Sequence, residues 1–152
     1  MFQIVHRIGI ASEPSTVFAA LNSTEGLSQW WTEEVEGECA LGGKVMFTFR
    51  KISGEMLGQL VMEVTKLIES EHIEWTCVEA PSDWVGTEIS FKLQKSGEQT
   101  IVVFAHRTWR EMNEHLAHCS TKWATFLLSL RGLLETGTGK PSPYDLKIDD
   151  WN

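Results

Sequence analysis

Residues 114–137 read EHLAHCSTKWATFLLSLRGLLETG, and this stretch decides the fold. Its apolar side chains recur every three or four residues, which is the spacing of a helix that docks by one face. Glycines and prolines follow between residues 137 and 143, and they end the pattern. We therefore expect one long helix near the end of the chain. Its apolar face carries Leu116, Cys119, Trp123, Phe126, Leu127, Leu130, Leu133 and Leu134.

The part of the chain before this helix has a different period. Apolar and polar residues alternate there, as they do in half-buried strands. Short connections rich in Ser, Gly and Pro separate the alternating segments, which indicates antiparallel neighbours. The sequence predicts six or seven such strands with one apolar face. The clearest segments are 2–10, 45–49, 60–65, 72–77, 88–93 and 100–108.

Two short helices are expected between the first two of these segments. Ser12-Glu13-Pro14 starts the first, and the second runs from Glu25 to Trp31. Residues 12–38 contain no Arg or Lys, so this pair is not a DNA-reading motif. The predicted fold is α+β, with a curved antiparallel sheet wrapped around the long C-terminal helix. We expect residues 1–152 to form a single domain.

Composition and charge exclude several classes of function. The formal net charge is −8 and no block of Lys or Arg occurs, so we expect neither nucleic-acid binding nor attraction to anionic membranes. The longest aliphatic and aromatic run, residues 101–105, is too short to insert into a membrane, and the first residues do not resemble a secretory signal. Three cysteines without CxxC spacing indicate free thiols in a reducing compartment. We therefore expect a cytoplasmic protein.

Three segments together carry a resemblance to a known family. They are IGIASEPSTVFAAL at 8–21, LSQWW at 27–31 and WATFLLSLRGLLETG at 123–137. The chain resembles the START-like, or SRPBCC, superfamily, and within it the branch of the activator of heat-shock-protein-90 ATPase. The resemblance implies a helix-grip fold with a pocket between the sheet and the C-terminal helix. Members of the superfamily include lipid carriers, hormone receptors, polyketide cyclases and ring-hydroxylase subunits, so the fold alone does not define the function.

The chain has seven Trp and seven Phe, which suit either a filled core or the wall of an apolar pocket. With the resemblance, we favour a pocket that a ligand can enter. His106 is the first candidate for a polar group that orients the ligand. The expected ligand-binding residues are Trp31, Phe47, Phe49, Met62, Trp75, Phe91, Phe104, His106, Trp123, Phe126 and Leu130.

Other chemistry has weaker support. His115, His118 and Cys119 lie on adjacent helical turns, where they could be metal ligands, but Cys119 also belongs to the apolar stripe. We predict no metal and no cofactor. No Gly-x-Ser-x-Gly motif is present, and no Cys has an identifiable His partner, so we assign no catalytic residue.

Three functions remain open at this point. The favoured one is non-enzymatic binding of a small hydrophobic or amphipathic molecule. The second is a stress-response or chaperone-cofactor protein that acts through its surface, with Trp84 or Trp151 as exposed contacts. The third is a small cyclase-, dehydratase- or hydrolase-like enzyme that uses His106. A homodimer is also expected, because the strands at the edges of the sheet expose unpaired backbone N–H and C=O groups that a second copy could cover.

Overall fold

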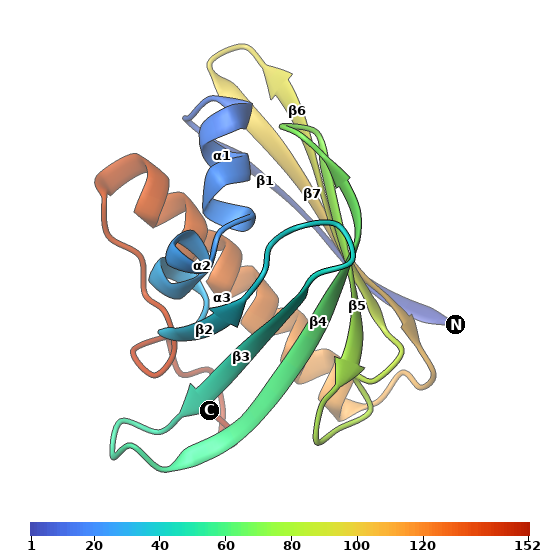
Figure 1. The fold of residues 1–152 in the computed structure, drawn as a ribbon. Helices are drawn as coiled ribbons and strands as arrows, with labels where there is room; N and C mark the ends of the chain where they lie inside the picture. The colour runs from blue at the N-terminus through green and yellow to red at the C-terminus, as the bar shows by residue number, and fades with distance from the viewer.

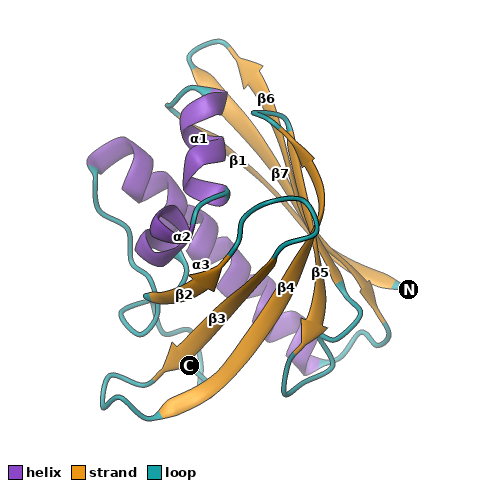
Figure 2. Ribbon diagram, in the orientation of Figure 1, coloured by secondary structure: helices purple, strands orange, loops and turns teal.

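The computed structural model describes residues 1–152 as one seven-stranded sheet with three helices on one side of it (Figure 1; Figure 2). The sheet curves around α3, which crosses it diagonally, so the predicted α+β helix-grip fold is confirmed. The elements in chain order are β1 (Phe2–Ile10), α1 (Pro14–Leu21), α2 (Thr24–Trp30), β2 (Glu34–Gly37), β3 (Lys44–Arg50), β4 (Met56–Ile68), β5 (His72–Glu79), β6 (Glu88–Ser96), β7 (Gln99–Trp109) and α3 (Glu114–Thr136).

All strand pairs of the sheet are antiparallel, and the spatial order is β1-β7-β6-β5-β4-β3-β2. The register of β4 against β5 shifts between Val61 and Met62 and again between Val64 and Lys66. Such bulges bend a strand and increase its twist. They contribute to the curvature of the long strand β4. The strand order leaves β1 and β2 as the free edges of the sheet.

Strand β2 is the element that the sequence analysis does not identify. It spans only four residues, so alternation along it is too brief to stand out. Val35 is half-buried, whereas Glu34 and Glu36 are exposed, and Glu34 pairs with Arg50 of β3. Charged side chains on a short edge strand are a common defence against edge-to-edge aggregation.

The ends of α3 follow from local chemistry. The side chain of Asn113 accepts a hydrogen bond from the backbone N–H of Leu116 at 3.0 Å, which caps the first turn. Gly137 has a φ of 88° and ends the helix in the left-handed conformation that glycine adopts without strain. The backbone then turns back closely, because a Cβ on Gly139 would lie 2.3 Å from the carbonyl oxygen of Gln29. The tail that follows returns along α3, where it contacts first Ser129 and then Lys122.

The core between the sheet and α3 consists of 26 buried hydrophobic residues. Aromatic rings occupy much of it. The ring centroids of Trp31 and Phe47 are 4.4 Å apart, and those of Phe104 and Trp123 are 4.5 Å apart. Phe91 contacts both Trp75 and Phe104 edge-on. The deep part of the space under the helix is therefore filled by side chains.

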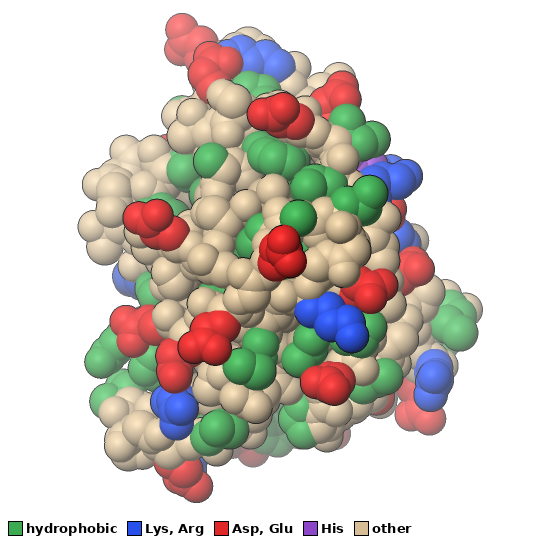
Figure 3. All heavy atoms as spheres, viewed as in Figure 1, with side chains coloured by type: hydrophobic (Ala, Val, Ile, Leu, Met, Phe, Trp, Pro, Cys, Tyr) green, Lys and Arg blue, Asp and Glu red, His purple; other side chains and the backbone are tan.

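Acidic side chains are spread over the surface. Figure 3 shows Asp and Glu across the viewed face, with few Lys or Arg between them. None of the three helices is long and apolar enough to cross a membrane.

Candidate ligand-binding site

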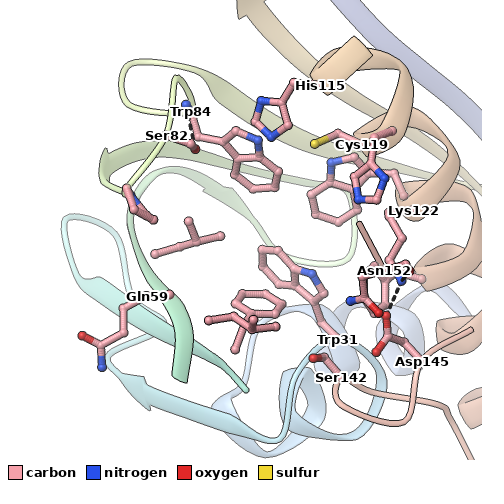
Figure 4. Close-up of a pocket in the computed structure, with 18 residues that line it drawn as sticks. Trp31, Gln59, Ser82, Trp84, His115, Cys119, Lys122, Ser142, Asp145 and Asn152 are labelled. Carbon is pink, nitrogen blue, oxygen red and sulfur yellow. Dashed lines mark hydrogen bonds and ion pairs between the residues drawn. The ribbon is translucent and has the colours of Figure 1, made fainter. Parts of the chain in front are cut away.

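A cavity of about 310 Å³ opens between the first half of α3 and the start of β4 (Figure 4). The β5–β6 loop and the C-terminal tail complete its wall. We call it the mouth pocket, because it lies outside the filled aromatic core. Its apolar lining includes Trp31, Phe49, Leu57, Leu60, Trp84, Cys119, Trp123 and Phe126.

Three tryptophans form the aromatic wall of the mouth pocket. The rings of Trp84 and Trp123 are stacked, with centroids 6.1 Å apart and an interplanar angle of 19°. Trp31 packs against Trp123 at 5.0 Å. Figure 4 shows Trp84 in the upper part of the pocket and Trp31 in the lower part, with open space between them. Rigid aromatic walls of this kind bury a large ligand surface at a low cost in side-chain entropy.

His106 of β7 holds this wall from behind and does not line the pocket. The indole Nε1–H of Trp123 donates to Nδ1 of His106 at 3.2 Å. Because the indole only donates, Nδ1 has no proton, and Nε2–H of the neutral ring donates to Oγ1 of Thr87 at 2.8 Å. The Thr87 hydroxyl donates in turn to the backbone carbonyl of Trp84 at 2.6 Å. His106 thus links the two stacked tryptophans through a complete hydrogen-bond chain.

Burial accounts for the protonation state of His106. The side chain is fully buried, and the resulting loss of solvation, together with the nearby His115, lowers the pKa of His106 to about 3. The ring is therefore neutral at physiological pH. Both of its nitrogens are engaged within the protein, so His106 has no free atom with which to contact a ligand.

The polar rim of the mouth pocket is built on one face of α3. His115, His118 and Lys122 line the pocket there, and each is held by an aspartate from another segment. Nδ1 of His115 lies 2.7 Å from Oδ1 of Asp83, in the β5–β6 loop. Nδ1 of His118 lies 2.7 Å from Oδ2 of Asp149, in the C-terminal tail, and this hydrogen bond lowers the pKa of Asp149.

Lys122 fastens the C-terminal tail to the rim. Its ammonium group pairs with the carboxylate of Asp145 and also donates to the backbone carbonyls of Leu146, at 2.9 Å, and Asn152, at 3.3 Å. The Asp145 side chain is 2% exposed, and Lys147 pairs with its other oxygen. Figure 4 shows Lys122, Asp145 and Asn152 together at one side of the pocket.

The predicted ligand-binding residues divide into two groups. Trp31, Phe49, Trp123 and Phe126 line the mouth pocket. The others lie in the buried core behind it, because rings and aliphatic side chains pack there without leaving a comparable space. This second group is Phe47, Met62, Trp75, Phe91, Phe104, His106 and Leu130.

The prediction that Trp84 is an exposed contact is wrong. Trp84 is half-buried against His106 and Trp123, whereas Trp151 is 54% exposed. Leu57 and Leu60 also line the pocket but are absent from the expected binding residues. They are three residues apart, so simple alternation along β4 would put them on opposite faces, and the register of β3 against β4 shifts next to Leu57. The tail carries no periodic signal, so nothing in the sequence indicates that Asp145 reaches the pocket.

His115, His118 and Cys119 do not converge as metal ligands. Each histidine is paired with a different aspartate, and no group of three or more His, Cys, Asp or Glu side chains is placed to hold a metal ion. Burial raises the pKa of the Cys119 thiol to about 12. A thiol of this kind is inert, because the thiolate is the form that reacts and binds metals.

A curved antiparallel sheet that grips a long C-terminal helix, with an apolar pocket between them, defines the START-like class of ligand-binding scaffolds. The chain belongs to the family of activator of Hsp90 ATPase homolog 1-like proteins, whose family model matches residues 11–135.

Solved structures agree with this assignment. The Aha1 dimer from Colwellia psychrerythraea is 41% identical, with a TM-score of 0.80, and the match covers 91% of this chain and 100% of that one. An AHSA1-like protein from Aeromonas hydrophila, 14% identical, has a TM-score of 0.74 and coverage of 90% and 94%. Protein SSP2350 from Staphylococcus saprophyticus, 17% identical, has a TM-score of 0.74 and coverage of 93% and 98%; these two likenesses concern the fold alone. No curated protein sequence matches the chain.

Proposed function

We propose that the chain binds a small apolar or amphipathic molecule in the mouth pocket and does so without chemical turnover. The observation that carries this proposal is the combination of an unfilled cavity of about 310 Å³ with a wall of three tryptophans. Burial of apolar ligand surface would supply the main driving force, at about 25 cal/mol per Å². The lining residues Trp31, Phe49, Trp123 and Phe126 would make these contacts, and His106 would hold the wall in place.

Thermal unfolding against a panel of fatty acids, sterols, isoprenoids, flavonoids and naphthalene derivatives tests the proposal. A ligand at 100 times its dissociation constant stabilises the native state by about 2.7 kcal/mol. For a domain of this size, that corresponds to a rise in Tm of about 5–10 °C. A rise that depends on ligand concentration supports the proposal, and a flat panel contradicts it.

Leu57 and Met56 provide a matched pair of variants for the same assay. They are neighbours at the start of β4 and are 50% and 49% exposed, but only Leu57 lines the pocket. We expect Leu57→Arg to weaken ligand binding at least tenfold, because it places a charge at the apolar mouth. Met56→Arg should leave the affinity unchanged within a factor of two. Equal effects of the two variants would place the ligand elsewhere.

The name of the family supports a second candidate, a contact with the Hsp90 chaperone through the protein surface. Trp151, which is more than half exposed, would belong to this contact. Co-purification with the purified chaperone, compared between the wild type and Trp151→Ser, tests it. No loss of binding in that variant would remove Trp151 from the contact.

We also infer that the chain forms a homodimer. The relative from Colwellia psychrerythraea, at 41% identity, is described as a dimer. The free strand edge of β1, where Val5 is 52% exposed, is a surface that a second copy could cover. Sedimentation equilibrium distinguishes a dimer from a 17.2 kDa monomer.

A further inference from the structure

We propose that the mouth pocket selects a neutral two-ring aromatic molecule that carries a hydrogen-bond donor, such as a phenolic hydroxyl or a ring N–H. This inference rests on the proposed function, since it names the class of ligand for the same pocket. It follows from the size of the cavity, from the state of the two rim histidines and from the charge around them.

The volume of the pocket indicates how much of a ligand it can enclose. A dry cavity of about 150 Å³ holds one benzene ring. The mouth pocket, at about 310 Å³, has room for about twice that, which corresponds to two fused rings. A four-ring sterol or an extended acyl chain would leave much of its apolar surface outside. The flat, stacked rings of Trp84 and Trp123 also favour a flat aromatic partner.

The rim histidines present acceptors to such a ligand. An ionised carboxylate only accepts hydrogen bonds, so Asp83 and Asp149 each fix the proton of the neighbouring imidazole on Nδ1. In a neutral imidazole of this tautomer, Nε2 carries a lone pair and accepts. Both rings line the pocket, and neither Nε2 has a hydrogen-bond partner within the protein. A donor on the ligand would supply the hydrogen bond that one of these Nε2 atoms lacks within the protein.

The charge of the rim disfavours an anionic ligand. Three aspartates, Asp83, Asp145 and Asp149, surround this end of the pocket, against two lysines. The ammonium group of Lys122 is already neutralised by Asp145 and occupied by two backbone carbonyls. No free cation remains on the rim to pair with a carboxylate or sulfonate, and the whole chain has a net charge of −8. A carboxylate placed beside His118 would meet Asp149 and Asp145 without compensation.

Three probes with the same ring system test the proposal: 2-naphthol, which is a neutral donor, 2-methoxynaphthalene, which is neutral and cannot donate, and 2-naphthoate, which is an anion. Their dissociation constants are measured at pH 7.5 from the quenching of tryptophan fluorescence, with calorimetry as a check. We expect 2-naphthol to bind about 3- to 10-fold more tightly than 2-methoxynaphthalene, which is the range of one net hydrogen bond. We expect 2-naphthoate to bind at least tenfold more weakly than 2-naphthol.

Variants separate the donor preference from the apolar pocket itself. In a His115→Phe, His118→Phe double variant, the ratio of the affinities for 2-naphthol and 2-methoxynaphthalene should fall to about one, whatever change the two probes share. The far-ultraviolet circular dichroism and Tm of the variant establish that it is folded, and each single variant provides the same comparison if the double variant is not.

The outcomes distinguish the two proposals. Equal affinities for the three probes, or tighter binding of 2-naphthoate, would overturn the selectivity for a neutral donor and leave the apolar pocket standing. Absence of binding for all three probes would overturn the ligand class, and the proposed function would fall with it if the thermal panel is flat as well. Retention of the naphthol preference in the double variant would remove the histidines as its cause and so overturn the inference.

Discussion

Replacement of Lys122 by Met is expected to lower the free energy of unfolding by about 3–5 kcal/mol, which is the usual cost of removing one member of a buried ion pair. The Asp145 carboxylate is 2% exposed and would lose its buried partner. The carbonyls of Leu146 and Asn152 would lose their donor as well, so the tail would separate from the rim of the mouth pocket. Chemical denaturation gives the loss of stability, and limited proteolysis of the tail detects its release.

Lys147 is the control for this prediction. It pairs with the other oxygen of Asp145 at 3.1 Å, but its side chain is 49% exposed, so Lys147→Met should cost less than about 1 kcal/mol. A double variant, Lys122→Met with Asp145→Leu, removes both buried charges and should recover much of the stability lost in the single variant. Equal costs for the two lysine variants would contradict the role given to Lys122 in fastening the tail.

Acid is expected to destabilise the wild-type protein through His106, and His106→Gln is expected to remove this contribution. The folded-state pKa of about 3 lies below the ordinary value of 6.5. Between these values the unfolded chain binds a proton at this residue and the folded protein does not, so a falling pH favours unfolding. The stability from the neutral ring is fully present above pH 6.5 and is lost progressively as the pH falls towards 3. By pH 5 the loss is about 2 kcal/mol.

Denaturation curves at pH 7.5 and pH 5 for the wild type and the variant measure this effect. At pH 7.5 the variant is expected to be about 1–3 kcal/mol less stable, because it disturbs the buried chain from Trp123 to Thr87. Carboxylates contribute equally to both proteins and cancel in the comparison; Asp149, whose pKa is lowered from 3.8, titrates below this range. An equal loss of stability in both proteins between pH 7.5 and pH 5 would contradict a buried neutral His106.

The periodic parts of the fold are predictable from the sequence. The long helix follows from a stripe that repeats over the whole of α3, and its end follows from Gly137. Most strands are long enough to show alternation. The four residues of β2 are not, and their pairing depends on β3, which lies next to them only after folding.

The candidate site is predictable in part. Aromatic residues near α3 can be chosen from the sequence, but whether a ring fills the core or faces an opening depends on how neighbouring rings pack. Phe47 and Phe49 lie two residues apart on one strand, yet Phe47 is buried among rings and Phe49 lines the mouth pocket. The contribution of Asp145 depends on an ion pair between the tail and α3, and such a contact leaves no local pattern in the chain.

The central claim is that a ligand enters the mouth pocket and not the filled core behind it. The indole N–H signals of the seven tryptophans report on both regions in one ¹H–¹⁵N spectrum. On titration with 2-naphthol, the signals of Trp31 and Trp84, which line the pocket, are predicted to shift, and those of Trp30 and Trp75 in the core to remain in place. Shifts confined to Trp30 and Trp75, or a spectrum without any change, would contradict the claim.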